Sequence, residues 1–360
     1  MSARLSARLS RVRLSSVILA VIGAVVLLGI PVTTDTFQTF QFAQVGVFVI
    51  AIIGLNLLTG YSGQISLGNG AFMAIGGYTT ALLARRLGVP YLLTIPLGGL
   101  LAAAAGFLIG IPALRLRGIY LALATFALAL SVTPVLNNFD TFTGGHAGIT
   151  LKLARPPLGL DLSNEQWLYF LCWGLVVILF VPAWLLVRSR TGRAWMAIRD
   201  SETAATANGV SISFYKTLAF AISAFYAGVA GSLQVILLTY VNPDSYGLGL
   251  SLSLLIGVVV GGLANIWGPV FGGLIVVWLP YYAEQAARIH IGSISLGGKP
   301  DIGFGILLLV IVFFAPAGIA GLLGRAFRRY RALRARLGAA PPPEPEPEPV
   351  ATTEGVEQAR

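Results

Sequence analysis

Polar side chains interrupt an otherwise apolar part of the chain between Gly60 and Gly70. They are Tyr61, Ser62, Gln64, Ser66 and Asn69. Hydroxyl and amide groups donate and accept hydrogen bonds without carrying a charge. A polar solute that crosses lipid needs its lost hydration replaced, and groups of this kind could replace it. The pattern has two interpretations: these residues line a translocation path, or they support the packing of neighbouring helices.

Motifs for covalent, acid–base or metal chemistry are missing from the sequence. It lacks H-E-x-x-H, paired-cysteine and G-x-S-x-G patterns, and its one cysteine, Cys172, lies in an apolar run. Gly292–Pro300 superficially resembles a phosphate-binding loop, but its lysine is displaced by one residue and precedes a proline. His146 has no histidine or cysteine nearby, so an ordinary loop residue is favoured over a ligand or pH sensor. We predict a non-enzymatic protein with no catalytic residue, metal or cofactor.

Ionisable groups at membrane depth are also missing. The carboxylates near apolar runs all fall in loops or at run ends: Asp35, Asp140, Asp161, Glu165, Asp244, Glu284 and Asp301. Proton-coupled and many sodium-coupled carriers need such a group inside the membrane. A pathway without it, and without a nucleotide site, favours a protein whose energy comes from another subunit.

The loop 188–216 is the long charged stretch between two apolar runs. Its charged residues are Arg188, Arg190, Arg193, Arg199, Asp200, Glu202 and Lys216. Thr191 could N-cap a helix there. Asn208-Gly209 is a good C-terminal stop, because glycine accepts the left-handed conformation. Asp200-Ser201 could instead cap a second short helix from Glu202 to Asn208.

A stripe of mostly small residues would lie on one face of this loop helix. It consists of Ala194, Ile198, Ser201 and Ala205, flanked by Trp195 and Glu202. Such a face suits close docking against a partner protein. The alternative is an amphipathic helix that lies on the membrane surface.

Composition places these features in a membrane protein. Of 360 residues, 56% are hydrophobic and 11% are charged, whereas soluble domains carry about 25% charged residues. The apolar runs are long and continuous, which predicts helices instead of the short alternating strands of a barrel. The net charge of +10 does not indicate nucleic-acid binding, because the arginines cluster at the ends of apolar runs.

We predict an all-α fold, a polytopic transmembrane bundle of about ten spans, although eight or nine full crossings would also fit the short, glycine-broken runs. The expected spans lie near 16–30, 42–58, 65–84, 92–114, 119–136, 167–187, 217–240, 247–262, 270–283 and 302–315. The third span is expected to begin near Ile65, because a helix from Ala71 to Ala84 would rise only about 21 Å.

The distribution of lysine and arginine predicts that both termini are cytoplasmic. The expected regions are a basic N-terminus 1–15, a transmembrane domain 16–324 that contains the charged loop 188–216, a basic juxtamembrane helix 325–340 that meets membrane lipids, and a disordered Pro/Glu-rich tail 341–360. Arg85-Arg86 falls on the outer side and is the exception. Residues 16–30 could instead be a cleaved signal peptide, but no small-residue cleavage site follows them.

Several motifs, in order along the chain, resemble a known permease family. They are Gly60–Gly70 with AFMAIGG after it, Arg199–Ala205 through Gly209, Lys216–Gly231, Val259–Gly262 with Gly268–Gly272, and Pro316–Gly321. From about Phe40 to Gly324 the chain resembles the permeases of branched-chain amino acid ABC importers, and among them the LivM-type subunits.

The resemblance implies an assembly in the bacterial cytoplasmic membrane. Two homologous permease subunits would form the pathway, two cytoplasmic ATPase subunits would bind the 188–216 loop as a coupling helix, and an extracytoplasmic binding protein would deliver a hydrophobic amino acid. The implied coupling residues are Arg199, Glu202, Ala204, Ala205 and Gly209.

One position departs from the family pattern. Importer permeases often carry E-A-A-x-x-x-G in this loop, and Ala204, Ala205 and Gly209 match it, but Thr203 stands at the glutamate position and Glu202 is one residue early. The alternatives are a permease of the same family for urea, a short amide or another amino acid, an ion-coupled secondary carrier that uses the 60–70 break as a discontinuous helix, and a passive channel.

Overall fold

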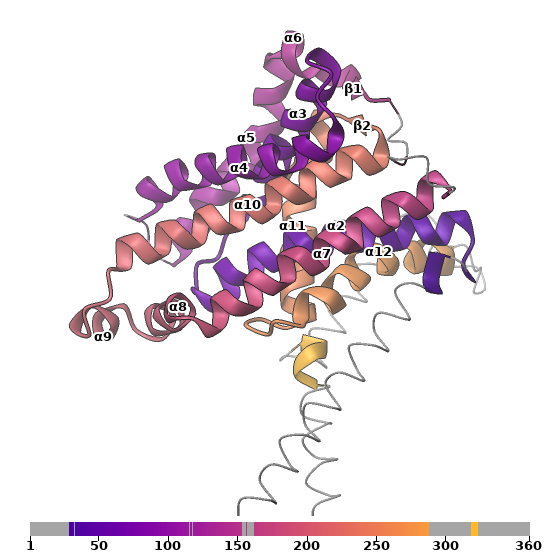
Figure 1. Ribbon diagram of the computed structural model, residues 1–360. Coiled ribbons are helices and arrows are strands. Elements are labelled where there is room, and N and C mark those ends of the chain that lie inside the picture. The colour runs from indigo at the N-terminus through magenta and orange to yellow at the C-terminus, as the bar shows by residue number, and fades with distance from the viewer. Residues whose placement is uncertain are drawn as a thin grey trace, which may run out of the picture. The chain divides into compact units, whose positions relative to one another are not determined.

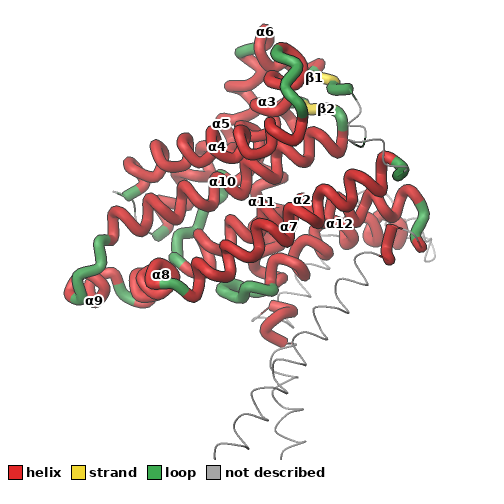
Figure 2. Tube along the Cα trace, in the orientation of Figure 1, coloured by secondary structure: helices red, strands yellow, loops and turns green. Residues whose placement is uncertain are grey.

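A computed structural model describes residues 29–31, 33–114, 116, 118–152, 156, 162–287 and 318–322. Regular structure in these residues is helical, apart from one short antiparallel ladder (Figures 1 and 2). The longer helices are α2 (Thr36–Leu55), α3 (Asn69–Arg86), α4 (Tyr91–Ala113), α5 (Ile119–Asn138), α7 (Asn164–Arg188), α8 (Arg190–Asp200), α10 (Ile212–Leu238), α11 (Leu248–Gly261) and α12 (Gly268–Ala287).

Shorter elements join these helices. They are the π-helix η1 (Asn56–Tyr61), α6 (Asp140–Thr143), the 3₁₀-helices η2 (Gly145–Ala147) and η4 (Pro243–Tyr246), and α9 (Glu202–Ala207). Strand β1 (Ile149–Thr150) pairs with β2 (Tyr240–Val241), so that Ile149 lies opposite Val241.

Six helical segments in the described residues are long and apolar enough to cross a membrane. They are Thr36–Tyr61, Tyr91–Ala113, Ile119–Asn138, Asn164–Arg188, Ile212–Leu238 and Pro243–Gly261. Each overlaps a predicted apolar run, which confirms the multi-pass helical class. The predicted spans 16–30 (apart from its last two residues) and 302–315 lie outside the described residues, as do the regions 1–15, 325–340 and 341–360.

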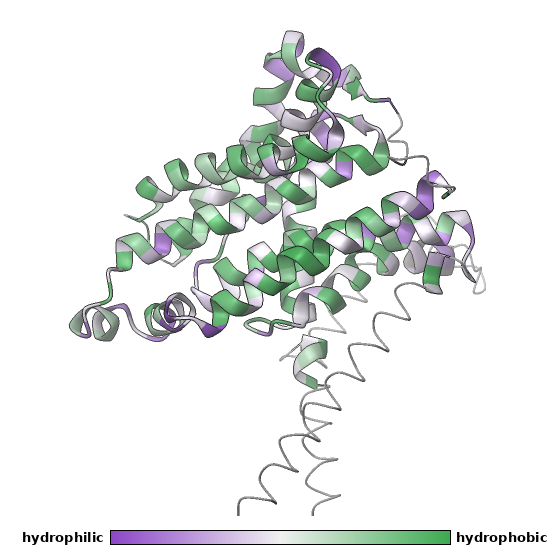
Figure 3. Ribbon diagram, viewed as in Figure 1, coloured by the Kyte–Doolittle hydropathy of each residue, from purple (hydrophilic) through white to green (hydrophobic). Residues whose placement is uncertain are grey.

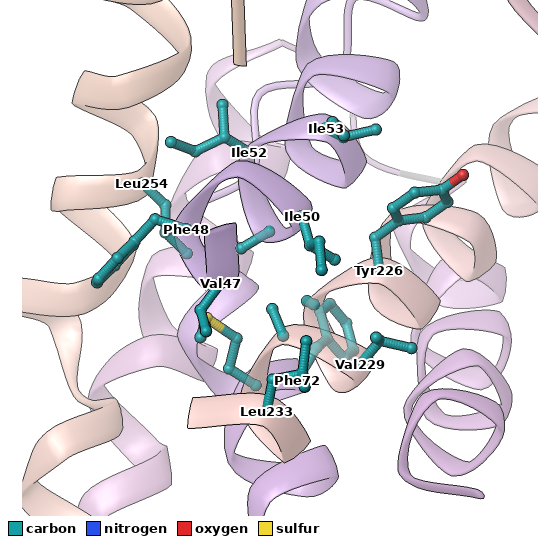
Figure 4. Packing of buried hydrophobic residues seen from close by; sticks show 14 of the residues in the cluster. Val47, Phe48, Ile50, Ile52, Ile53, Phe72, Tyr226, Val229, Leu233 and Leu254 are labelled. Atoms are coloured by element: carbon teal, nitrogen blue, oxygen red, sulfur yellow. The ribbon is translucent and has the colours of Figure 1, made fainter. Parts of the chain in front are cut away.

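Two of these helices, α2 and α10, form the buried centre. In their most apolar stretches 83% and 78% of the residues are buried, whereas in α7 the share is 17%. Figure 4 shows α2 side chains such as Ile50 packed against Val229 and Leu233 of α10 and Phe72 of α3. The helices α2, α10 and α7 are all apolar. The lower burial of α7 therefore shows that it exposes an apolar face, as a helix in contact with lipid does.

Glycines let α10 approach α3 and α4 closely. A Cβ added at Gly76 would collide with the backbone of Gly228, and a Cβ at Gly228 would collide with Ala102. Gly106 faces Ala224 in the same way. The small residues at helix-packing spacing therefore act as contact points between helices, as expected where lipid provides no hydrophobic drive for helix association.

The two ends of α10 carry different features. Helices α8 and α9 precede Ile212, and the β1–β2 ladder lies beyond Leu238 (Figure 1). Arg86 lies at the ladder end, where its Nη2 donates to the carbonyl oxygen of Thr141 at 2.6 Å and its guanidinium lies 5.0 Å from the centre of the Phe142 ring. The Arg85-Arg86 pair thus lies at the end of the bundle opposite the loop 188–216. The predicted topology places this pair on the outer side, as its one exception to the positive-inside rule.

Candidate functional site

The helical path from α2 to α3 is broken. The π-helix η1 extends α2 to Tyr61, residues 62–68 are not helical, and α3 begins at Asn69. The expectation that this helix begins near Ile65 is therefore wrong. The backbone groups of the break have other partners: Gln64 N donates to Leu58 O, and Leu67 N donates to Thr125 Oγ1. Buried backbone groups must be hydrogen-bonded, and because these groups bond to other partners, no helical turn is required here.

The break runs from the loop 188–216 into the interior of the bundle. Gly63 lies against Arg199 of α8, Gly68 lies against Thr125 of α5, and Gly70 lies against Ser251 of α11. Non-helical backbone inside a membrane protein is tolerated where protein or a cavity surrounds it. Ser62, Gln64, Ser66 and Gly68 are buried in this way, while Gly63 and Ile65 are exposed.

The five residues predicted to line a path are all buried. Their exposed fractions are 5% for Tyr61, 2% for Ser62, 5% for Gln64, and 0% for Ser66 and Asn69. Ser62 donates to Leu58 O, Gln64 donates to Ser62 Oγ, and Ser66 Oγ accepts from Gly68 N. The Asn69 amide has no hydrogen-bond partner within the described residues.

Asn56 is a buried amide that sequence reasoning missed. Its Nδ2 donates to Asn265 O at 2.9 Å, and its Oδ1 accepts from Ala264 N at 3.0 Å. Ala264 has φ 54°, a left-handed conformation that is rare without glycine. The amide therefore holds the turn between α11 and α12 in a strained conformation. The sequence signal that could have identified Asn56 is the presence of an asparagine within an apolar run.

The loop 188–216 contains two helices, α8 and α9. Ser189 caps α8 by accepting from Thr191 N at 3.1 Å, so the prediction of Thr191 as the cap is wrong. The serine is favoured because its backbone is extended, as an N-cap requires, while Thr191 already lies inside the helix. Ser201 caps α9 by accepting from Ala204 N, which confirms the alternative of a second short helix. Gly209, at φ 76°, follows the end of α9.

Three of the four residues of the predicted docking stripe face the bundle, and the fourth, Ser201, is exposed. Ala194, Ile198 and Ala205 are 8%, 3% and 2% exposed, and the fully buried Trp195 donates from Nε1 to Tyr215 O of α10 at 2.8 Å. The stripe packs inward because it is the apolar side of an amphipathic helix. The opposite side is open to solvent and carries Arg193, Ala197, Asp200, Thr203, Ala204 and Ala207.

Arg199 and Glu202 point back toward the bundle and connect the loop to it. Arg199 Nη1 donates to Gly60 O at 3.0 Å, and its Nε and Nη2 contact Asp200. Glu202 Oε1 pairs with Lys216 Nζ at 2.5 Å. The Lys216 side chain is 8% exposed, so this is a largely buried ion pair at the start of α10.

The two residue groups that the sequence predicted separately meet at this point. Ser62, Gln64, Arg199, Glu202 and Lys216 line one small cavity of about 110 Å³. Gln64 Nε2 also donates to Lys216 O at 3.4 Å. Sequence reasoning placed Lys216 only at the boundary of the loop, because a contact between residues far apart in sequence leaves no local pattern.

The fold and this site define a class of protein. A multi-pass helical bundle, whose charged loop is hydrogen-bonded to the end of η1 directly before the break, is the architecture of a polytopic membrane protein. A family model described as "Branched-chain amino acid transport system / permease component" matches residues 38–315, and the chain belongs to this family of permeases. It is a multi-pass protein of the inner membrane.

Individual relatives carry related descriptions. The high-affinity branched-chain amino acid transport system permease proteins LivM of Salmonella typhimurium and Escherichia coli are 37% identical over 243 residues, which cover 61% of this chain and 57% of theirs. The chain thus matches less than two thirds of their length.

More distant relatives are described as importers of other compounds. The autoinducer 2 import system permease protein LsrC of Photorhabdus laumondii is 24% identical over 64% of this chain and 66% of its own. The ribose import permease protein RbsC of Escherichia coli is 26% identical over 62% of this chain and 68% of its own. No solved structure matches the chain.

Proposed function

We propose that this chain is the permease subunit of an ABC importer that moves branched-chain, hydrophobic amino acids across the cytoplasmic membrane. The observation that carries the proposal is the 37% identity to the two LivM proteins, against 24% and 26% to the autoinducer 2 and ribose permeases. The proposed partners are a second homologous permease, two cytoplasmic ATPase subunits, and an extracytoplasmic amino-acid-binding protein.

The solvent-facing side of α8 and α9 is the surface we assign to the ATPase subunits. Ala197, Ala204 and Ala207 are exposed on it, and their small side chains allow close approach to the helix backbone. Ala205 supports this surface from behind, since it is 2% exposed. Gly209 then lets the chain turn toward α10.

Polar links would carry a movement of the loop into the membrane, and one of them is the hydrogen bond from Trp195 to Tyr215 O of α10. Arg199 holds Gly60 at the end of η1, and Glu202 holds Lys216 at the start of α10. Since α2 and α10 are the most buried of the candidate spans, a displacement of α8 and α9 acts on the centre of the bundle. Closely packed interfaces switch between discrete arrangements, and ATP binding can drive that switch only by differential affinity for the two states.

Within the candidate path, Asn69 is the residue we assign to the transported solute. Ser62 and Gln64 already bond within the chain, which fits a role in supporting the break. The Asn69 amide keeps both its donor and its acceptor for another group. A buried amide without partners is costly, so a polar group that meets it during transport would gain hydrogen bonds.

The proposal is tested by uptake into proteoliposomes that contain the full importer. We expect ATP-dependent uptake of radiolabelled leucine that unlabelled isoleucine and valine compete, while ribose and urea do not. Uptake that persists without ATP and collapses with an ionophore would show an ion-coupled carrier instead. Competition by urea or a short amide, with none by valine, would assign the chain to another substrate.

A further inference from the structure

The Arg85-Arg86 pair has no role in the transport proposal and lies at the end of the bundle where the topology rule disfavours cations. Arg86 is explained by its contacts with Thr141 and Phe142. Arg85 is exposed, and its guanidinium makes no ion pair or hydrogen bond with any other described residue. Figure 3 shows this end of α3 as a hydrophilic segment.

A cavity of about 590 Å³ lies beside Arg85. It is bounded by the last turn of α3, the residues that lead into α4, the segment after β1, and the last turn of α10. Arg85 and Lys152 bring two positive charges to its wall, and no carboxylate is among its lining residues in the described chain. Its other lining includes the hydroxyl-bearing Thr150 and the apolar Ile236.

Neighbouring side chains put this cavity at the membrane interface. Tyr91 lines it, and Trp167 Nε1 donates to the Tyr91 hydroxyl at 2.9 Å. Tyrosine and tryptophan favour the headgroup level of a bilayer. Leu87 and Leu93 are 71% and 59% exposed nearby in sequence, which suits contact with acyl chains.

Stabilisation of a helix end explains part of this pattern but not all of it. Cations in the last turn of α3 interact favourably with the negative end of the helix dipole, and this applies to Arg85 and Arg86 alike. It does not apply to Lys152, which comes from a different segment and reaches the same cavity. Two cations from separate segments around one concave space indicate a site for an anion.

We propose that this cavity binds the phosphate of an anionic phospholipid headgroup. The Arg85 guanidinium presents a fork of donors that matches phosphate oxygens. Lys152 adds a second positive charge, and the Thr150 hydroxyl can donate a hydrogen bond. The lipid is favoured over an acidic protein surface because the site is concave, has an apolar part and adjoins exposed leucines.

The test measures bound lipid on the purified full-length chain in detergent by native mass spectrometry, with phosphatidylglycerol, phosphatidylcholine and inorganic phosphate as separate probes. The variants are Arg85→Gln and Lys152→Gln. The matched control is Arg86→Gln, which removes the same charge from the same helix turn but does not line the cavity. Since one cation near an anionic surface is worth roughly a fivefold change in affinity, we expect each cavity variant to weaken phosphatidylglycerol binding about fivefold.

Arg86→Gln is expected to change binding less than about twofold, and phosphatidylcholine to bind more weakly than phosphatidylglycerol. Equal losses for Arg85→Gln and Arg86→Gln would overturn the proposal in favour of simple helix-end electrostatics. Competition by inorganic phosphate at equal concentration would identify a site for free phosphate instead. Unchanged lipid binding, together with weaker docking of an external binding protein, would reassign the surface to that protein.

Discussion

Gly63 and Gly209 have nearly the same left-handed backbone but different surroundings. Their φ angles are 74° and 76°. A Cβ at Gly63 would lie 2.7 Å from Arg199 Cγ, whereas nothing lies within 4 Å of a Cβ at Gly209. A left-handed alanine costs roughly 1 kcal/mol at either site. Gly63→Ala adds a collision with Arg199, the residue that donates a hydrogen bond to Gly60 O.

We therefore expect Gly209→Ala to lower stability by about 1 kcal/mol and leave uptake near normal. Gly63→Ala is expected to cost at least about twice as much and to reduce ATP-driven uptake. Thermal unfolding in detergent and uptake into proteoliposomes measure the two effects. Equal behaviour of the two variants would show that the Arg199 contact has no part in coupling.

The Glu202–Lys216 pair gives a second prediction for single residues. Its side chains are 29% and 8% exposed, while the side chains of the Arg199–Asp200 pair are 36% and 70% exposed. Removing one partner costs about 3–5 kcal/mol in a buried pair and up to about 1 kcal/mol in an exposed one. Glu202→Gln leaves Lys216 charged and largely buried, so we expect a loss of about 2 kcal/mol.

Asp200→Asn is the matched control, because it removes the same charge from an exposed pair, and its effect is expected to stay within about 0.5 kcal/mol. Denaturation in detergent measures both variants. The double variant Glu202→Leu with Lys216→Met is expected to recover most of the stability, since an apolar pair needs no partner for a buried charge. A Glu202→Gln protein as stable as Asp200→Asn would contradict the buried-pair interpretation.

At the scale of elements, the crossing of α3 with α10 depends on glycine. Gly76→Ala would place a methyl group on the backbone of Gly228, which cannot move aside as a flexible side chain can. We expect a loss of about 3 kcal/mol and a lower yield of folded protein. Gly174→Ala in α7 is the control, because a Cβ there meets nothing within 4 Å.

The control is expected to be neutral or stabilising by about 0.5–1 kcal/mol, since alanine is the better helix former. Midpoints of thermal unfolding and yields after purification compare the two. If Gly76→Ala behaved like Gly174→Ala, the close approach of α3 to α10 would not be a requirement of the fold.

Long apolar runs predicted their helices well, because twenty apolar residues have one stable arrangement in lipid. The run 92–114 corresponds to α4 and 217–240 to most of α10. The start of α3 was missed because Leu67 N and Gln64 N bond to distant or earlier groups instead of forming a helical turn. Tertiary hydrogen bonds decide such a boundary, and one sequence does not show them.

The candidate site was predicted as two sets of residues but not as one site. Polarity identified Ser62 and Gln64, and family resemblance identified Arg199 and Glu202. The two sets come together beside Lys216 because α8 and α9 pack against α10, and one sequence does not show that packing. The orientation of the loop was also missed, since an alanine-rich stripe suits docking to a partner and packing on the chain itself equally well.

At the scale of the whole molecule, the fold puts the proposed energy input and the candidate path in direct contact. Arg199 reaches Gly60, and Gly60 begins the segment that leads to Asn69. No long relay is needed between them. A partner that moves α8 and α9 would act on the break through Arg199, and on α10 through Trp195 and Glu202.

Docking at the exposed side of α9 can be separated from folding by two adjacent alanines. Ala204 is exposed, while Ala205 is 2% exposed and faces the bundle. Ala204→Arg is expected to leave yield and thermal stability within about 0.5 kcal/mol of the parent, because surface substitutions usually do. It is expected to reduce ATP-driven uptake at least about tenfold, the effect of losing about 1.4 kcal/mol of docking energy.

Ala205→Arg is expected to lower the yield of folded protein, because it would bury a charge without a partner. Ala204→Ser controls for the change at position 204, since a small side chain still allows close approach. Uptake, ATPase rate and thermal unfolding are measured on the same preparations. Normal uptake by a well-folded Ala204→Arg protein would remove α9 from the docking surface, and the energy input would then have to enter through α8 alone or elsewhere on the permease.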